Sequence, residues 1–143
     1  MRATTQVAPL PAGVALPVRL AGTALLGATG GIHLDLWATG YRDIEWIGPL
    51  FLVNAVGAIV LAVAVLLAPG RWLPWACAAG ALLELGTLGG LLLSVTVGFL
   101  GFFETWEAPL ARTSAVVEVA GALVLGGFAV AELLRSRQRR PRA

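Results

Sequence analysis

Four long apolar segments constrain the fold of this chain more than any other feature of its sequence. They cover residues 18–37, 47–68, 73–100 and 110–134. A helix needs about 20 apolar residues to cross the hydrocarbon core of a bilayer, and each segment is near or above that length. Barrel strands are not expected, because the segments are continuous and lack the alternating pattern that a transmembrane barrel requires. The sequence therefore predicts an all-α membrane protein with four transmembrane helices.

The composition agrees with a membrane environment. The chain has 143 residues, of which 58% are hydrophobic and 13% are charged. Soluble domains carry roughly 25% charged residues, and a soluble core of this size could not bury so many apolar side chains. The length suits one domain, residues 1–143. The basic residues lie mainly at the ends of the apolar segments, so we expect no nucleic-acid partner.

The first apolar segment has the alternative interpretation of a cleaved signal peptide, because Arg2 and Arg19 precede an apolar stretch. However, the segment is near spanning length and ends in an aromatic turn at Trp37 instead of a small-residue cleavage site. We therefore expect the segment to be retained as the first transmembrane helix.

Short connections join the four segments, at residues 38–46, 69–72 and 101–109. Connections of this length force consecutive helices to run antiparallel. The Pro69–Gly70 pair is a turn signal at a point where the chain must reverse. The expected fold is therefore an antiparallel, up-down-up-down bundle of four helices.

The basic residues are divided unevenly between the two sides of this bundle. Arg42 and Arg112 fall on one side, and eight arginines fall on the side that holds both chain ends. Cytoplasmic loops carry the excess of basic residues, so we expect a multi-pass protein of the cell membrane with both termini in the cytoplasm. Residues 135–143 would form a basic, disordered cytoplasmic tail. The eight arginines are Arg2, Arg19, Arg71, Arg135, Arg137, Arg139, Arg140 and Arg142.

Glycines in the apolar segments predict where helices pack closely. Small residues allow helix backbones to approach one another, and the spacing GxxxG is typical of such contacts. We expect these glycines to pack helices within the chain, and a dimer interface is the alternative. The glycines are the pairs Gly27 with Gly31 and Gly86 with Gly90, and the group of Gly121, Gly126 and Gly127.

Two carboxyl groups lie inside the apolar segments, where an ionisable side chain costs about 2.5–3.5 kcal/mol at the helix centre. Glu84 lies near the middle of the third segment, and Glu118 lies about two turns below the outer end of the fourth. Small residues surround both on their helix faces, so both should point into the bundle, where burial favours the neutral acid. The structural alternative is that each is a hydrogen-bonded link between helices.

His33 and Asn54 add polar groups: His33 lies near the outer end of the first segment, and Asn54 lies at a depth similar to that of Glu118. His33 and Asp35 are two residues apart and therefore project about 200° apart on a helix, so they cannot both bind one ion. We expect Asp35 to reach the interface, whereas His33 is either a hydrogen-bonded interior residue or part of a site. Because the polar groups lie mostly in the outer half, we predict a ligand pocket there, near His33, Asn54, Glu84 and Glu118.

The two outer connections are rich in charged residues. In the favoured interpretation, Arg42 pairs with a carboxylate of the other connection and holds the two turns together. In the functional interpretation, the charged residues form a polar lid over a pocket that opens outward. The expected lid residues are Arg42, Asp43, Glu45, Glu104 and Glu107.

Sequence motifs for catalysis or for binding a metal or cofactor are not found in the chain. The single cysteine, Cys77, excludes an intrachain disulfide and a cysteine-cluster metal site. We therefore assign no catalytic residue and expect neither a metal nor a cofactor.

The run from Gly31 through His33 to Trp37, followed by Gly40-Tyr41-Arg42 and by Ile47-Gly48 and Asn54, resembles small actinobacterial four-helix membrane proteins. More distantly it is similar to the DoxX-like superfamily, in which a Gly-x-x-His or Gly-x-x-Lys run precedes an Ile-Gly turn into the second helix. The resemblance covers the first two helices and the four-helix layout. It implies an accessory role beside a membrane redox enzyme, and it carries over one residue, His33.

These observations favour a non-enzymatic membrane protein that acts as an accessory subunit or binds a lipid-like or quinone-like small ligand. Membrane lipids are the expected partners, together with another membrane protein or a second copy of the chain. One alternative is a membrane-embedded acid–base enzyme, such as an isomerase, that uses His33 and a carboxyl group. The other is a proton- or cation-coupled transporter that uses Glu84 and works as an oligomer.

Overall fold

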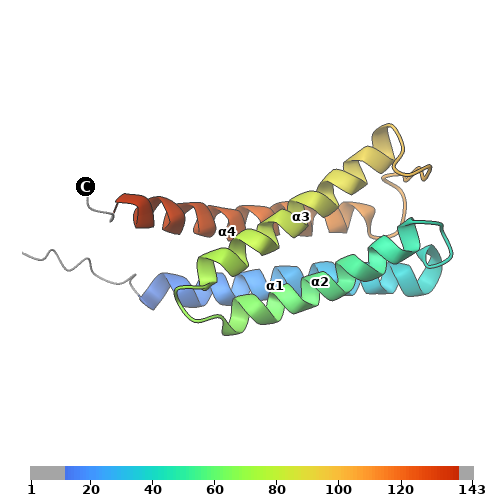
Figure 1. The fold of residues 1–143 in the computed structure, drawn as a ribbon. Coiled ribbons are helices and arrows are strands. Elements are labelled where there is room, and N and C mark those ends of the chain that lie inside the picture. The colour runs from blue at the N-terminus through green and yellow to red at the C-terminus, as the bar shows by residue number, and fades with distance from the viewer. Residues whose placement is uncertain (1–11, 139–143) are drawn as a thin grey trace, which may run out of the picture.

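The computed structural model describes residues 12–138, which form four long α-helices and one short π-helical turn (Figure 1). Each of the four helices is long and apolar enough to cross a membrane, so the prediction of four such helices is confirmed. Their bounds are α1 Ala12–Leu36, α2 Ile47–Leu67, α3 Leu73–Thr96 and α4 Ala111–Gln138, and the π-helix η1 covers Trp37–Tyr41.

Helix α3 ends four residues before its predicted end at residue 100, although the sequence stays apolar. Gly98 has a φ of +85°, a left-handed conformation that glycine adopts without steric cost and that ends the helix. Phe99 and Phe102 then exchange two backbone hydrogen bonds and form a tight reversal. Backbone conformation, which hydropathy does not report, therefore sets this end.

The start of the first helix and the end of the last helix also differ from the expectation. Helix α1 begins at Ala12, six residues before the predicted start, and continues through η1 into the predicted first connection. Helix α4 continues to Gln138, so the first four residues of the predicted disordered tail are helical. Residues 139–143, and the predicted cytoplasmic arginines Arg2, Arg139, Arg140 and Arg142, lie outside the described residues.

The helices pack as two pairs, α1 against α2 and α3 against α4, and α1 also packs against α4. Figure 1 shows the start of α1, the α2–α3 connection and the end of α4 at one end of the bundle, called here the terminal end. The other two connections lie at the opposite end, called here the loop end. Helix α3 is tilted against α2, so the two helices diverge toward the loop end (Figure 1).

The apolar core lies in the terminal half of the bundle. Leu26 of α1, Val65 of α2, Leu73 of α3 and Leu125 of α4 are fully or almost fully buried there. The helices can approach closely because small residues face these leucines. A Cβ atom placed on Gly80 of α3, for example, would lie 3.0 Å from Leu125 and 3.2 Å from Leu26.

The predicted packing glycines are wrong for two of the three groups. A Cβ on any of the glycines in the two GxxxG pairs, Gly27 with Gly31 and Gly86 with Gly90, would meet no other described atom within 4 Å. In the third group Gly121 packs closely, because a Cβ there would lie 2.8 Å from Oε1 of Glu84. The inward glycines of α1 and α3 are instead Gly22, Gly30 and Gly80, which lie on other faces of the same helices.

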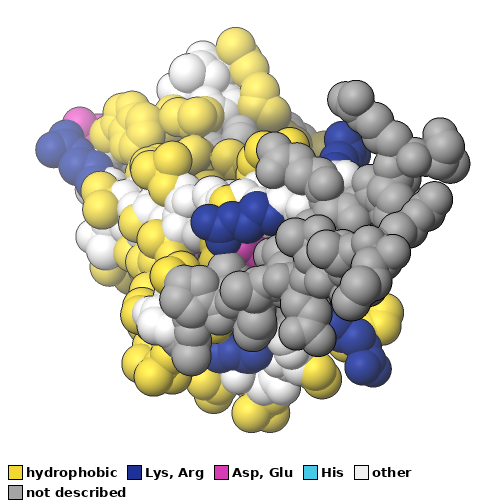
Figure 2. All heavy atoms as spheres, turned by 90° about the vertical axis from the view of Figure 1, so that its left-hand side faces the viewer, with side chains coloured by type: hydrophobic (Ala, Val, Ile, Leu, Met, Phe, Trp, Pro, Cys, Tyr) yellow, Lys and Arg dark blue, Asp and Glu magenta, His cyan; other side chains and the backbone are white. Residues whose placement is uncertain are grey.

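Apolar side chains cover the flanks of the bundle, and charged side chains gather at its ends. Figure 2 views the terminal end, where arginine side chains are spread between hydrophobic flanks. Arg71, Arg135 and Arg137 are exposed at this end, and Arg42 and Arg112 are exposed at the other. Arg19 is half-buried and donates hydrogen bonds to the carbonyl oxygens of Val65, Leu66 and Ala68 at 2.6–2.9 Å, which satisfies the C-terminus of α2.

We predict that Gly121→Ala lowers the free energy of unfolding by about 1–3 kcal/mol, because the added methyl group would press on the buried Glu84 side chain. Gly127→Ala on the same helix is the matched control, since its methyl group would enter open space. Its effect should stay within about 1 kcal/mol, in the stabilising direction, because alanine favours helix. Unfolding of both variants by SDS in mixed micelles measures the difference, and equal stabilities would contradict the packing.

Candidate functional site

A cavity of about 520 Å³ lies between α2 and α3 in the loop half of the bundle. Several of its lining residues are also exposed on the outer surface, among them Leu50 and Val53 of α2 and Leu82 and Leu85 of α3. The cavity therefore opens sideways between these two helices, and its mouth is apolar. Gly86, Gly89 and Gly90 of α3 line the cavity as well, and their missing side chains contribute to its volume.

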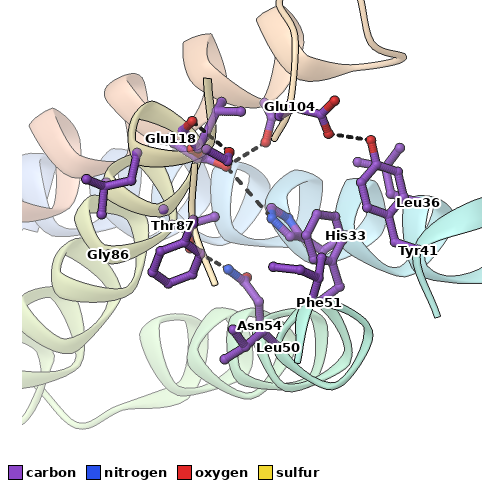
Figure 3. Close-up of a pocket in the computed structure, with 18 of the residues that line it drawn as sticks. His33, Leu36, Tyr41, Leu50, Phe51, Asn54, Gly86, Thr87, Glu104 and Glu118 are labelled. Carbon is purple, nitrogen blue, oxygen red and sulfur yellow. Dashed lines mark hydrogen bonds and ion pairs between the residues drawn. The ribbon is translucent and has the colours of Figure 1, made fainter. Parts of the chain in front are cut away.

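The wall of the cavity carries polar side chains from each of the four helices. His33 comes from α1, Asn54 from α2, Thr87 from α3, and Ser114 and Glu118 from α4. In Figure 3 the side chains of His33, Asn54 and Glu118 project toward the same space. Three of the four predicted ligand-binding residues are thus brought together around one cavity.

His33 and Glu118 face each other across the inner wall. The Nδ1 atom of His33 lies 2.9 Å from the carbonyl oxygen of Thr29, which can only accept, so Nδ1 carries the hydrogen. The other ring nitrogen, Nε2, lies 4.0 Å from Oε1 of Glu118. Ser114 donates to that same Oε1 at 2.5 Å, whereas the buried Oε2 of Glu118 has no hydrogen-bond partner among residues 12–138.

Asn54 forms a second polar group on the wall. Its Nδ2 atom donates to the hydroxyl oxygen of Thr87, and that hydroxyl in turn donates to the carbonyl oxygen of Leu83 at 2.9 Å. The Oδ1 atom of Asn54 is buried and has no partner in the described part of the chain. We call Oδ1 of Asn54 and Oε2 of Glu118 the two unpaired oxygens. A buried polar atom without a partner costs about 1–3 kcal/mol, which marks this wall as incomplete on its own.

Glu84, the fourth predicted ligand-binding residue, does not belong to the cavity lining. It is fully buried, and the single hydroxyl hydrogen of Thr29 is shared between the two carboxyl oxygens of Glu84, which lie 3.1 and 3.0 Å from Oγ1 of Thr29. The carbonyl group of the same Thr29 orients His33. Glu84 therefore contacts the site through Thr29 and has the hydrogen-bonded, linking position that was the structural alternative for it.

Aromatic residues line the cavity at the loop end, and they were not predicted from the sequence. The hydroxyl of Tyr41 in η1 donates to Oε2 of Glu104 at 2.5 Å (Figure 3). The Tyr41 ring stacks on Phe51 with a centroid distance of 4.8 Å and meets the edge of Phe102 at 5.7 Å. The available signal was a tyrosine beside the charged residues of the first outer connection.

The predicted ion pair of Arg42 with a carboxylate of the other connection is wrong. Arg42 pairs with its neighbour Asp43 at 3.4 Å, and the two outer connections are joined by the hydrogen bond between Tyr41 and Glu104. Adjacent residues in one turn need less chain ordering to meet than residues from two loops.

Most of the predicted lid residues lie away from the cavity. Arg42, Asp43 and Glu45 are exposed and line a separate shallow hollow. Glu107 is also exposed, and its Oε1 atom lies 3.8 Å from Nη2 of Arg112. Among the five, Glu104 lines the cavity. Asp35 is exposed. In the part of the chain that the structure describes, His, Cys, Asp and Glu side chains form no group of three that could hold a metal ion.

Comparison with known proteins gives no precedent for this site. No family model, no curated protein and no solved structure matches the chain. The resemblance of the first two helices to DoxX-like proteins therefore stays a prediction.

We predict that Thr29→Val destabilises the bundle by about 1–3 kcal/mol, because it removes the hydroxyl donor to the buried Glu84 at almost constant side-chain volume. Thr113→Val, at an exposed position of α4, is the control and should change the stability little. SDS titration of both variants in mixed micelles measures the loss. Equal unfolding curves for Thr29→Val and the unmodified chain would refute the importance of this contact.

Proposed function

We propose that the chain is an integral protein of the cell membrane whose four helices cross the bilayer in alternating directions. The four apolar helices support this placement, as do their apolar flanks and the alternation of the connections between the two ends in Figure 1. The described arginines at the terminal end support an orientation with both chain ends in the cytoplasm. In this orientation the loop end faces outward.

We further propose that the cavity binds a lipid-soluble small molecule. The observation that carries this proposal is an apolar cavity of about 520 Å³ whose lining includes Asn54 and Glu118, the two residues that hold the unpaired oxygens. Ligand pockets are typically about 300–1,000 Å³ in volume and combine apolar walls with a few convergent polar groups. A polar head group in the cavity would supply the hydrogen bonds that the described residues do not supply.

The mouth of the cavity indicates where this molecule comes from. The rim is formed by exposed apolar side chains of α2 and α3, on a flank that would face the acyl chains of the bilayer. A molecule dissolved in the bilayer could therefore enter between α2 and α3 without crossing water. At the loop end, the cavity is lined by the hydrogen-bonded pair of Tyr41 and Glu104 and by the packed rings of Phe51 and Phe102.

The proposed ligand is therefore lipid-like or quinone-like, and the protein is a binding or accessory subunit. A bundle of this size would hold such a molecule for, or accept it from, another membrane protein or a second copy of the chain. This role needs a site with selective contacts, which the cavity offers, and no chemical step within the chain.

We predict that Gly90→Phe blocks ligand binding. Gly90 lines the cavity and a Cβ atom there would meet no other described atom within 4 Å, so the phenylalanine side chain would occupy space that the ligand needs. Gly27→Phe is the matched control, since Gly27 also lies in open space but on an exposed face of α1 away from the cavity. Native mass spectrometry from detergent, with 1-dodecanol and decylubiquinol as probes, should show one bound molecule per chain for the unmodified protein and for Gly27→Phe.

Binding to Gly90→Phe should be weaker by about tenfold or more, and circular dichroism of both variants checks that the helices are retained. Equal binding by Gly90→Phe and Gly27→Phe would show that the cavity is not the binding site.

A second candidate function, an acid–base enzyme, is supported by one distance. His33 and Glu118 are 4.0 Å apart on the cavity wall and could both reach one bound molecule, as general acid–base catalysis requires. The transport alternative has no comparable support, because Glu84 is packed against Gly121 outside the cavity lining.

Deuterium incorporation distinguishes a binder from an acid–base isomerase. An isomerase would exchange protons with an unsaturated ligand, so a β,γ-unsaturated long-chain ketone incubated with it in D₂O would gain deuterium and shift its double bond. For a binding protein we predict that the unmodified chain incorporates deuterium no faster than the His33→Ala variant. Mass spectrometry of the recovered ketone measures both rates. Incorporation that depends on both His33 and Glu118 would favour the enzyme.

A further inference from the structure

We infer that the cavity selects a head group with a hydroxyl hydrogen to donate, so that its ligand is a lipid-soluble alcohol or phenol. This inference rests on the proposed function of the cavity and concerns the chemical class of the ligand. It follows from the hydrogen bonds that the polar side chains of the cavity wall already make with one another and with the backbone.

The orientation of the Asn54 amide is fixed by its neighbour. Thr87 has a single hydroxyl hydrogen, which it donates to the carbonyl oxygen of Leu83 at 2.9 Å. The hydroxyl oxygen of Thr87 can therefore only accept a hydrogen bond from Asn54. The NH₂ group is the part of the amide that can donate it. If the amide were turned around, Thr87 would have to turn its hydrogen away from Leu83 to donate to the amide oxygen, and one of these two hydrogen bonds would be lost. Oδ1 of Asn54 is thus held as an acceptor, and an amide oxygen cannot donate.

The opposite wall offers acceptors as well. Nδ1 of His33 uses its hydrogen on the carbonyl group of Thr29, so a neutral imidazole presents the lone pair of Nε2 toward Glu118. The hydrogen of Ser114 is committed to Oε1 of Glu118. In its acid form, Glu118 can supply one hydrogen through Oε2, the second of the two unpaired oxygens. The wall therefore holds more acceptors than hydrogens.

A hydroxyl group matches this pattern, and a carbonyl group does not. Asn54 Oδ1 and Glu118 Oε2 have almost no accessible surface, so a ligand reaches them through a small rotation of these two side chains. A hydroxyl can then donate its hydrogen to Oδ1 of Asn54, and its own oxygen keeps lone pairs that accept the hydrogen of an acidic Glu118. A ketone, quinone or ester oxygen can only accept, so it would leave Oδ1 of Asn54 buried without a partner. Burying an unsatisfied acceptor weakens binding, which makes the oxidised or alkylated analogue of the ligand the poorer one.

The apolar body of the ligand has an equally defined place. The polar wall lies at the inner side of the cavity, and exposed apolar residues such as Val53 and Leu85 form the mouth. The hydroxyl would point inward, and the apolar body would extend toward the mouth between α2 and α3. A long-chain alcohol and the reduced, quinol form of a lipid quinone share this chemistry.

Two matched ligand pairs test the inference. The first pair is 1-dodecanol and its methyl ether, and the second is decylubiquinol and decylubiquinone under argon. In each pair the first member can donate a hydroxyl hydrogen and the second cannot. Native mass spectrometry of the unmodified protein should give about tenfold tighter binding for the hydroxyl member of at least one pair. The pair with the larger preference identifies an alcohol or a phenol as the source.

Variants on the cavity wall assign the preference to Asn54. The preference is the ratio of the affinities of the two members of a pair. In Asn54→Leu this ratio should fall to about one, because the acceptor oxygen is removed. Thr87→Val should reduce it as well, because the amide is then free to turn its NH₂ group toward the ligand. Thr23→Val is the control and should keep the preference, since Thr23 does not line the cavity and its hydroxyl donates to the carbonyl oxygen of Ala62. Comparing preferences between proteins in the same micelles cancels the different partitioning of the two ligands.

Equal binding of both members of each pair by the unmodified protein would overturn the inference and leave the cavity as a binding site. A full preference retained in both Asn54→Leu and Thr87→Val would also overturn it. If no member of either pair binds, the proposed function fails together with the inference. The comparison needs only one folded variant. Either Asn54→Leu or Thr87→Val should keep the helix content and the unfolding midpoint of the unmodified protein.

Discussion

The hydrogen bond from Thr29 to Glu84 joins α1 to α3, two helices that otherwise have few contacts, and the rest of the bundle is arranged around it. A fully buried carboxyl group needs a donor, and Thr29 supplies it. Helix α4 can reach the same point because Gly121 leaves room for the Glu84 side chain. The backbone carbonyl of Thr29 then sets the ring of His33, and His33 faces Glu118. One polar contact at the centre thus orients the site beside it.

On either side of this contact the bundle differs in character. In the terminal half, Leu26, Leu73 and Leu125 pack against small residues, and the helices lie close together. In the loop half, α3 diverges from α2 (Figure 1), and Gly86 and Gly90 present no side chains to fill the space between them. The cavity is a consequence of this divergence and of these glycines. Close packing in one half and an open wall in the other are what a rigid scaffold with a site requires.

The sequence was informative about the helices and about the depth of their polar residues. Apolar length placed the four helices, and the cost of polar groups in lipid singled out His33, Asn54 and Glu118, which line one cavity. It was less informative about helix faces. In a membrane protein both the inner and the outer face of a helix are apolar, so hydropathy carries no period that tells them apart.

This ambiguity explains the errors in the sequence analysis. The GxxxG spacing identified Gly27 with Gly31 as a packing pair, but the packing face of α1 carries Gly22 and Gly30. Glu84 was expected at the pocket, and its contact with Thr29 places it behind the cavity wall. The link between Tyr41 and Glu104 depends on the path of two loops, which residue types alone do not report.

In the proposed function, a membrane-dissolved amphiphile enters between α2 and α3 and places its head group at the inner wall of the cavity. A diazirine-bearing long-chain alcohol, photoactivated in vesicles that contain the protein, tests this claim most directly. We expect peptide mass spectrometry to find the label concentrated on cavity residues of α2 and α3, such as Leu50 and Gly90. Labelling spread evenly over lipid-facing positions, including Val116 of α4 on the outer surface, would contradict it.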